Sequence, residues 1–283
     1  MRVVTKTREL HAARPSLPAP VGFVATMGAL HAGHLSLVAR ARAECASVIV
    51  SVFVNPLQFG PSEDFAAYPR RTDEDRKALE GADVDLLFAP SEDEMYPNKP
   101  DVFVEPTSIA HELEGQRRPG HFRGVATVVL KLFNLVTPQR AYFGEKDAQQ
   151  LAVIRKMVSD LAIPIEIVAC ETVRESDGLA LSSRNAYLSP EERRNAPRLH
   201  RALERAREAI GAGQRQVARA IDDARTLLEP LREDYLALVH PDEFRPLEIA
   251  PPASSLLLVG AAFAGKTRLI DNLRVQTPAR AEE

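Results

Sequence analysis

Short apolar segments and longer amphipathic stretches alternate over roughly the first 170 residues of the chain. Segments at 21–25, 47–54 and 83–90 have the composition of buried strands in a parallel sheet, rich in Val, Ile, Leu and Phe. Further apolar segments at 141–143 and 165–170 continue the series, and apolar residues at helical spacing lie between the segments. This succession predicts an α/β fold with a parallel sheet.

The last third of the chain has a different pattern. Residues 189–192 (Ser-Pro-Glu-Glu) form a capping box with proline at the first helical position, and apolar residues recur at helical spacing up to a glycine stop at 211. A second amphipathic helix is predicted over about 217–228. Short strands follow at 235–239, 255–259 and 267–270. We therefore expect a smaller α+β domain after a boundary near 176–188, with domains at 1–180 and 181–283.

Candidate chemistry is concentrated where the first apolar segment ends. Thr26, Gly28, His31, Gly33 and His34 follow it, and an amphipathic helix comes next. This order places the histidines near a helix N-terminus, whose unpaired N–H groups and positive dipole attract anions. Two histidines three residues apart also occur by chance, so the sequence context is what favours a phosphate site.

The second apolar segment also ends in polar residues. Asn55 and Gln58 come directly after it. In a parallel sheet, ligands bind beyond the carboxyl ends of the strands, so both are candidate substrate contacts. The alternative is that Asn55 before Pro56 simply forms a turn.

Two further segments carry groups that suit phosphate. The sequence Gly144-Glu145-Lys146-Asp147 follows a strand and precedes a helix that contains Gln150, so it offers a lysine for phosphate and an acid for ribose hydroxyls. The run 182–184 (Ser-Ser-Arg) offers two hydroxyl donors and a guanidinium, which suit an anion. Such a run is also common in solvated loops.

Two segments allow two interpretations each. Residues 73–75 (Asp-Glu-Asp) suit either the first turn of a helix with Thr72 as its N-cap or a Mg²⁺ site. Residues 119–124 (Pro-Gly-His-Phe-Arg-Gly) suit either a mobile loop that carries a cation or a plain entry into a helix at 125–136.

The sequence 260–267 matches the P-loop pattern G-x-x-x-x-G-K-[ST]. A P-loop needs a following helix and further strands of a parallel sheet, for which the remaining 16 residues leave no room. A β-hairpin with Gly265 in its turn is the better prediction.

Composition narrows the function classes. The chain has 283 residues, 45% hydrophobic and 27% charged, and a net charge of −3, which gives no reason to expect a nucleic acid or an anionic membrane as partner. It has no apolar run of the ~20 residues that a membrane helix needs and opens without an apolar signal region. Cys45 and Cys170 are expected to be buried thiols, and no Cys/His cluster has zinc spacing. We expect a cytoplasmic protein.

Taken together, the motifs resemble those of the pantoate–β-alanine ligase family, within the nucleotidylyltransferase superfamily. The similar segments, in order along nearly the whole chain, are 26–34, 53–59, 120–125, 143–150, 174–185 and 265–272. The resemblance implies a Rossmann-like N-terminal domain with a smaller C-terminal domain, in a homodimer. It also implies an AMP-forming acid–amine ligase in pantothenate and coenzyme A biosynthesis. ATP and (R)-pantoate would give pantoyl adenylate and pyrophosphate, and β-alanine would then displace AMP to give pantothenate.

The resemblance also implies residue roles. His34 would donate a proton to phosphate with His31 beside it, Lys146 would hold phosphate, and Ser182, Ser183 and Arg184 would clamp the triphosphate. The residues implied for ATP are Met27, Gly28, Ala29, Leu30, His31, Ala32, Gly33, His34, Gly144, Glu145, Lys146, Asp147, Val173, Leu181, Ser182, Ser183 and Arg184. Those implied for the other substrates are Gln58, Gln150 and Asn55. Mg²⁺ is expected as a companion of ATP, with its protein ligands unassigned.

Two alternatives remain beside the ligase. A nucleotidylyltransferase with another acceptor, such as a phosphate ester, would want additional Arg or Lys beside Asn55 and Gln58, and that stretch has none. An RNA-binding relative would need a basic face, which the net charge of −3 disfavours. Leu181 departs from most relatives, which carry Met there; the change preserves apolar volume, so we expect function to be retained.

Overall fold

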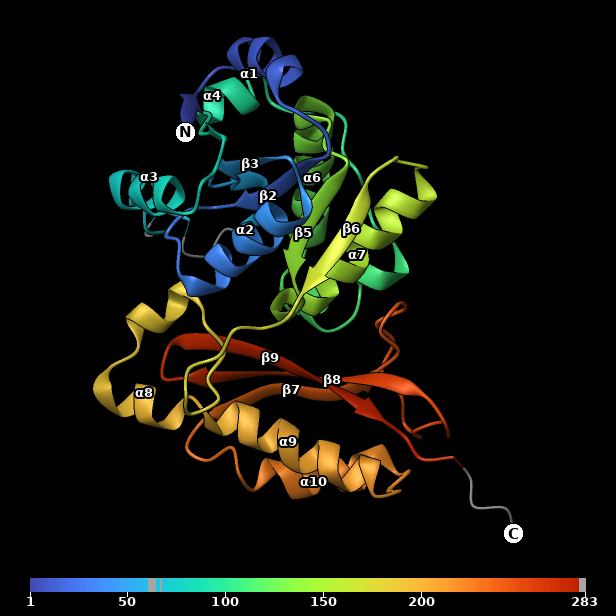
Figure 1. Ribbon diagram of the computed structural model, residues 1–283. Coiled ribbons are helices and arrows are strands. Elements are labelled where there is room, and N and C mark those ends of the chain that lie inside the picture. The colour runs from blue at the N-terminus through green and yellow to red at the C-terminus, as the bar shows by residue number, and fades with distance from the viewer. Residues whose placement is uncertain (61–64, 67, 280–283) are drawn as a thin grey trace. The chain divides into compact units, whose positions relative to one another are not determined.

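The computed structural model describes residues 1–60, 65, 66 and 68–279. By internal contacts the chain divides into two compact units. The N-terminal unit comprises Met1–Glu145 and Val153–Glu171, and the C-terminal unit comprises Lys146–Ala152 and Thr172–Glu283 (Figure 1). The expected functional division at residues 180 and 181 stays a prediction.

The N-terminal unit is built on a six-stranded sheet with the order β1-β4-β3-β2-β5-β6. Its strands are β1 (Arg2–Val4), β2 (Val21–Thr26), β3 (Ser47–Val52), β4 (Leu86–Phe88), β5 (Arg140–Gly144) and β6 (Glu166–Cys170). Each neighbouring pair in this order runs parallel, which confirms the predicted parallel α/β fold. The chain winds outward from β2 to β4 and then returns to β5 beside β2. The order therefore reverses between β2 and β5, the place where such sheets bind ligands.

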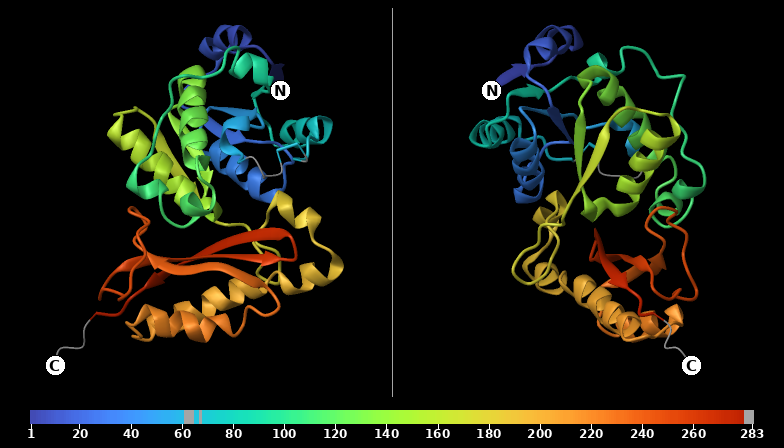
Figure 2. Two further views of the ribbon diagram at one scale, coloured as in Figure 1. Left: turned by 180° about the vertical axis from the view of Figure 1, so that it is seen from behind. Right: turned by 45° about the vertical axis from the view of Figure 1, so that its right-hand side comes forward.

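Helices cover both faces of this sheet. They are α1 (Thr7–Ala13), α2 (Ala32–Glu44), α3 (Thr72–Gly81), α4 (Glu92–Met95), α5 (Glu114–Arg117), α6 (His121–Val136) and α7 (Ala148–Asp160). Successive strand residues face opposite ways. Phe23 packs edge-on against Phe133 of α6, with ring centroids 6.4 Å apart, whereas Val24 belongs to a core cluster with Leu37 and Val38 of α2. Accordingly, α2 and α6 lie on opposite faces of the sheet (Figure 2).

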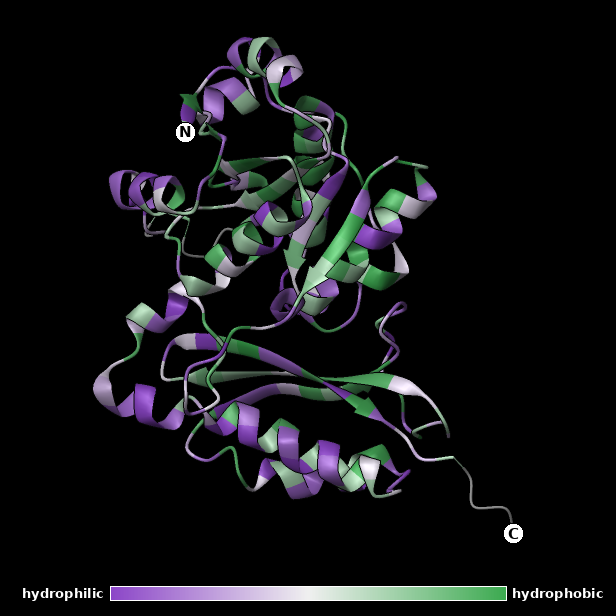
Figure 3. Cartoon of the chain, in the orientation of Figure 1, coloured by the Kyte–Doolittle hydropathy of each residue, from purple (hydrophilic) through white to green (hydrophobic). Residues whose placement is uncertain are grey.

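The C-terminal unit has an antiparallel sheet in the order β7-β8-β9. Its strands are β7 (Arg232–Val239), β8 (Ser255–Ala264) and β9 (Thr267–Gln276), and its helices are α8 (Pro190–Asn195), α9 (Arg198–Gly211) and α10 (Val217–Arg225). Apolar residues of α9, such as Leu203, share one core with Leu238 and Leu258 of the sheet. The mixed colouring of α9 and α10 in Figure 3 reflects this amphipathic pattern. The predicted smaller α+β unit is confirmed.

Three local predictions need correction. Ser189 does form the predicted capping box with Glu192, but the helix it begins ends at Asn195, and α9 starts only after Pro197, whose ring disfavours a continuous helix. Thr72 is the first residue of α3 rather than its cap, a place taken by Arg71. Of the two interpretations of residues 119–124, the helix entry is correct and the mobile loop is wrong from His121 on, but α6 begins at His121 rather than at residue 125.

The P-loop-like stretch is a β-hairpin, as predicted. Ala264 on β8 pairs with Thr267 on β9, so Gly265 and Lys266 form a two-residue turn. Gly265 has a φ of +58°, a left-handed conformation that favours glycine. Both cysteines are buried and free, as expected. Within the described part of the chain, no helix has the length and apolar character needed to cross a membrane.

The hairpin generates a prediction for Lys266→Ala. Lys266 is exposed in the turn, whereas a P-loop lysine would bind the phosphates of the nucleotide. We expect ATP affinity, measured by titration calorimetry, to change by less than about twofold, as for an exposed substitution away from any site. A loss of tenfold or more would show that the hairpin binds nucleotide after all.

Candidate active site

The loop from β2 to α2 presents both histidines at the start of a helix. His31 is the N-cap of α2, and its Nδ1 accepts a hydrogen bond from the backbone N–H of Gly33 at 3.1 Å. The backbone N–H of His31 points back to Nδ1 of His34 at 3.4 Å. The two rings lie against each other with centroids 4.1 Å apart. The helix start thus fixes both imidazoles.

This capping arrangement determines which ring nitrogen can donate. Because both Nδ1 atoms accept backbone N–H bonds, the proton of each neutral imidazole is assigned to Nε2. Nε2 of His31 and Nε2 of His34 are then hydrogen-bond donors at the positive end of the α2 dipole. Such a pair suits an anionic oxygen that gains negative charge.

A buried carboxylate holds the loop that precedes the histidines. Gly28 and Ala29 both have positive φ, at +83° and +50°. Asp75 of α3, only 3% exposed, accepts the backbone N–H of Ala29 at 2.9 Å and that of Leu30 at 2.7 Å. Gly28 also lies close, since a Cβ there would be 2.9 Å from Asp75 Oδ2. Asp75 thus stabilises a conformation that alanine rarely adopts.

This finding distinguishes among the three acids at 73–75. All three lie in the first turn of α3, as the helix interpretation predicts. Asp73 and Glu74 are exposed, whereas the Asp75 carboxylate is engaged by the loop. Within the described residues, no group of three or more His, Cys, Asp or Glu side chains is placed to hold a metal ion.

After β3, Asn55 uses both ends of its amide to organise the candidate substrate contacts. Its Nδ2 donates to Gln58 Oε1 at 3.0 Å and to the Gly124 carbonyl at 3.2 Å. Its Oδ1 accepts from the backbone of Leu57 and from the Tyr96 hydroxyl, at 3.3 and 2.9 Å. Burial raises the pKa of Tyr96 above its usual value, so the phenol remains protonated and donates. Asn55 therefore orients Gln58.

The start of α6 interlocks with this turn. A Cβ on Gly124 would lie 2.1 Å from the Leu57 carbonyl oxygen, so only glycine fits there without displacing the backbone. His121 Nδ1 lies 2.9 Å from the Gln58 carbonyl oxygen. The cation proposed for this segment is engaged elsewhere, since Arg123 pairs with Glu105 at 3.2 Å and stacks on Phe103. Residues 121–124 thus support the turn that holds Gln58.

Gln58 also reaches the first loop, because its Nε2 donates to Sδ of Met27 at 3.2 Å. In the N-terminal unit the structure therefore brings Met27, Gln58 and Asn55 together. His31 and His34 follow Met27 along the same loop and helix start.

The remaining candidates of the N-terminal unit, Gly144 and Glu145, end β5 and begin the next turn, η4 (Glu145–Asp147). The other candidates fall in the C-terminal unit. Lys146 has a mostly buried side chain whose Nζ lies 3.7 Å from Asp147 Oδ1, and Gln150 is half-buried in the first turn of α7. The predicted place of Gln150 at a helix start is confirmed, and its role as a substrate contact stays a prediction.

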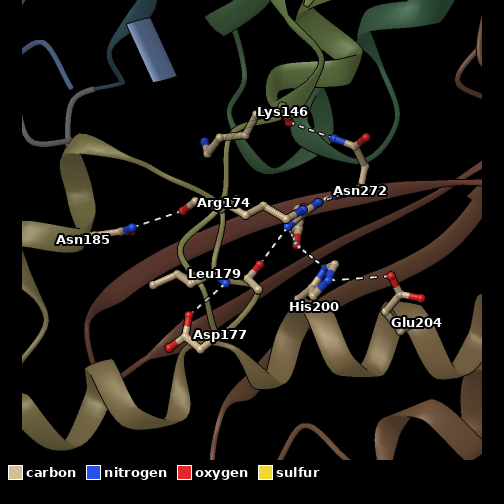
Figure 4. Close-up of polar contacts among 11 residues, drawn as sticks. Lys146, Arg174, Asp177, Leu179, Asn185, His200, Glu204 and Asn272 are labelled. Carbon is tan, nitrogen blue, oxygen red and sulfur yellow. Dashed lines mark hydrogen bonds and ion pairs between the residues drawn. The ribbon is translucent and has the colours of Figure 1, made fainter. Parts of the chain in front are cut away.

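A short hairpin presents Leu181 to Arg184. Arg174 and Ala180 form an antiparallel bridge, and the backbone N–H of Leu181 donates to the Val173 carbonyl at 3.0 Å. Ser182 then caps the turn η5 (Ser183–Tyr187), its Oγ accepting from the Arg184 backbone at 3.3 Å. Asn185 Nδ2 donates to the Ala180 carbonyl at 3.1 Å, which closes the loop (Figure 4).

The arrangement defines a class of protein. A parallel sheet with two imidazoles at a helix N-terminus, on the loop that leaves the sheet where its order reverses, is typical of α/β proteins that bind nucleotides. The chain has the fold and the loop chemistry of that class.

Comparison with known proteins identifies the family. The model of the pantoate-beta-alanine ligase family matches residues 2–274, and the chain belongs to this family. Pantothenate synthetase of Chloroflexus aggregans is 53% identical, covering 96% of this chain and 99% of that protein. Pantothenate synthetase of Thermus thermophilus is 55% identical, covering 97% of this chain and 99% of that protein. The chain is thus an ATP-dependent ligase of pantoate and β-alanine.

Solved structures agree with this assignment. A crystal structure of the Thermus thermophilus enzyme has a TM-score of 0.91 at 54% identity, covering 96% of this chain and 99% of that chain. A pantoate-beta-alanine ligase from Francisella tularensis, complexed with beta-gamma ATP and beta-alanine, has a TM-score of 0.80 at 36% identity, covering 96% and 97%. The Rossmann-like fold with a smaller second domain is confirmed.

Sequence reasoning missed several residues that hold the candidates in place. Asp75 was one of three adjacent acids. Tyr96 lies 41 positions from Asn55, and Asn272, whose Nδ2 donates to the carbonyl of Lys146, lies 126 positions from that residue. For Asn272 the available signal was the resemblance of segment 265–272 to the family, which marked the region but did not show what Asn272 contacts.

The Asp75 anchor leads to a prediction for Asp75→Asn. An amide keeps one acceptor but directs an NH₂ group at a backbone N–H, so one charge-assisted hydrogen bond is lost. We expect the free energy of unfolding to fall by about 2 kcal/mol and ATP affinity to fall with it. Denaturant titration and calorimetry would measure the two effects.

Asp73→Asn is the matched control, because Asp73 is exposed two residues earlier on the same helix. It should change the unfolding free energy by less than about 0.5 kcal/mol. Equal effects of the two substitutions would show that Asp75 acts only through its negative charge at the N-terminus of α3 and not through its bonds to the loop.

Proposed function

We propose that the chain forms pantothenate in two chemical steps. The carboxylate of (R)-pantoate first attacks the α-phosphate of ATP, giving pantoyl adenylate and releasing pyrophosphate. The amine of β-alanine then attacks the acyl carbon of the adenylate, forming the amide and releasing AMP as the amine gives up a proton. The observation that carries this proposal is the pair of imidazoles fixed at the N-terminus of α2.

The first step joins two anions, so the enzyme has to offset negative charge and align the reactants. We assign His34 as the donor of this step: its Nε2–H group donates a hydrogen bond to the phosphate oxygen as negative charge develops there, with His31 beside it. Nε2 is the suitable atom because Nδ1 of each ring is engaged by backbone. Residues 27–34 would contact ATP along this loop.

Residues later in the chain would bind the rest of the nucleotide. Lys146 would offset charge on the phosphates, and Ser182, Ser183 and Arg184 would clamp the triphosphate through hydroxyl and guanidinium donors. Gly144, Glu145, Asp147 and Val173 would contact the nucleoside. Leu181 would pack against adenine in place of the usual Met, with its apolar volume preserved.

Gln58 and Gln150 would bind pantoate, and Gln58 would also contact β-alanine. A carboxamide suits a substrate with hydroxyls and a carboxylate because it both donates and accepts. Asn55 would support Gln58 rather than touch pantoate, since its Nδ2 and Oδ1 already make four hydrogen bonds.

We further propose that Mg²⁺ binds with ATP, that the chain forms a homodimer, and that it works in the cytoplasm on the path to coenzyme A. Mg²⁺ commonly takes most of its ligands from phosphate and water, with one or two carboxylates at most. This preference is compatible with the absence of a three-ligand metal cluster among the described residues.

The decisive assay measures AMP and pyrophosphate released from ATP and Mg²⁺ in the presence of (R)-pantoate, with β-alanine added or withheld. Both products should accumulate in equal amounts when both substrates are present. Pyrophosphate formation from pantoate with no response to β-alanine would support the adenylating step but contradict β-alanine as the acceptor of the acyl group. No turnover by folded protein in any mixture would refute the proposal.

His34→Ala tests the donor assigned to the phosphate oxygen. Removing one donor that acts on the transition state should lower turnover roughly 10²–10³-fold. His11→Ala is the matched control, because His11 is exposed on α1. The control should keep wild-type turnover, and circular dichroism should show both variants folded. If His34→Ala also kept wild-type turnover, His34 would have no catalytic role.

A further inference from the structure

Segment 265–272 resembles the family, yet its P-loop-like part is a hairpin turn that the proposed reaction does not use. The end of the segment, Asp271 and Asn272 on β9, is buried, with 5% and 8% of each residue exposed. Both residues are polar and make long-range contacts within the C-terminal unit (Figure 4). Those contacts lead to the two segments that the proposal assigns to phosphate.

Asn272 reaches the segment that carries Lys146. Its Nδ2 donates to the main-chain carbonyl of Lys146 at 3.0 Å. The two residues lie 126 positions apart in the sequence, so this hydrogen bond is a tertiary contact and not part of the local structure around Lys146. Because the bond is to the backbone, it fixes where the lysine is presented without using the donors of the ammonium group.

Asp271 holds the root of the hairpin that leads to the clamp at 181–184. Its two carboxylate oxygens accept from Nη1 and Nη2 of Arg174, at 2.7 and 2.8 Å. Arg174 also donates to the carbonyls of Gly178 and Asn272, at 3.0 and 3.3 Å. A bidentate pair of this kind fixes orientation as well as distance.

A histidine completes this cluster. Nδ1 of His200 lies 3.3 Å from Asp271 Oδ2, a close approach without hydrogen-bond alignment, and its Nε2 lies 3.7 Å from Glu204. The ring also packs against the hairpin, since a Cβ on Gly178 would be 2.5 Å from His200 Cδ2. Burial acts to raise the pKa of Asp271, but His200 and Arg174 outweigh it and lower the pKa below the usual value. The carboxylate is therefore charged at neutral pH.

We propose that Asp271 and Asn272 are positioning residues that hold Lys146 and the 181–184 loop in fixed relation to each other. Two adjacent residues in the middle of β9 thus set the spacing of the groups that meet the phosphates of ATP. The inference rests on the proposed function, because it takes the phosphate roles of Lys146 and residues 181–184 from there.

The test is a double-mutant cycle of Asn272→Leu with Lys146→Ala, read as ATP affinity by calorimetry on the full chain. Leucine is similar in size to asparagine and removes the donor. Asn272→Leu alone should weaken ATP binding about tenfold, within the range for one lost hydrogen bond to a placed group. In the Lys146→Ala background it should have little further effect, since the group it positions is gone.

If Asn272 only stabilised the fold and did not position Lys146, the cycle would give a different result. The effect of Asn272→Leu would then multiply with that of Lys146→Ala, because general loosening does not depend on the lysine. Gln276→Leu is the matched control, an amide replaced on the same strand at an exposed position. It should leave ATP affinity unchanged. Thermal melting of each variant would distinguish a variant that is unfolded from one that is folded but has Lys146 displaced.

Asp271→Asn tests the second contact by the same logic. Combined with Arg184→Ala, its effect on ATP affinity should be less than the product of the two single effects. Independent, multiplying effects in both cycles would overturn the inference and leave the proposed ligase activity standing. A wild-type chain that binds no ATP would overturn both, and the wild-type titration alone would reveal it.

Discussion

The two hydrogen bonds from Ala29 and Leu30 to the buried Asp75 carboxylate are the interaction on which the N-terminal half of the candidate site depends. The chain that leaves β2 has to turn before it can begin α2, and this turn uses positive φ at Gly28 and at Ala29. Alanine does not favour that conformation, so it persists only where other contacts stabilise it. Asp75 supplies them from α3, and the position of both imidazoles follows from the turn.

The same physical device recurs in the C-terminal unit. Asp271 is a second buried carboxylate whose oxygens are engaged by groups far away in sequence, here the guanidinium of Arg174. In both units the charged group that shapes the loop is a different residue from those assigned to substrate. A buried carboxylate is costly unless it is fully hydrogen-bonded, and once satisfied it permits few alternative arrangements. This property suits loops that must present side chains accurately.

Features of the fold that depend on residues close together in the sequence could be predicted, whereas those that depend on distant residues could not. Strands β2 and β3 were predictable because burial on both faces leaves a continuous apolar run in the sequence itself. The caps at His31 and Ser189 involve residues within three positions of each other. Asp75 contacts Ala29 across 46 positions, and no local pattern distinguishes it from Asp73. The start of α6 at His121 was not predicted, because the neighbouring glycines suggested a loop. In the structure, Gly124 packs closely against Leu57 within the first turns of the helix.

The P-loop-like sequence illustrates why a motif has to be judged with its surroundings. Glycine at 265 is required because a two-residue hairpin turn needs positive φ, and the following Lys266 and Thr267 belong to the turn and to the start of β9. In a P-loop the same letters would arise from close approach of backbone to phosphate. What the hairpin provides is register, since the pairing of Ala264 with Thr267 fixes which β9 residues face inward. Asp271 and Asn272 lie where they do because the turn is two residues long.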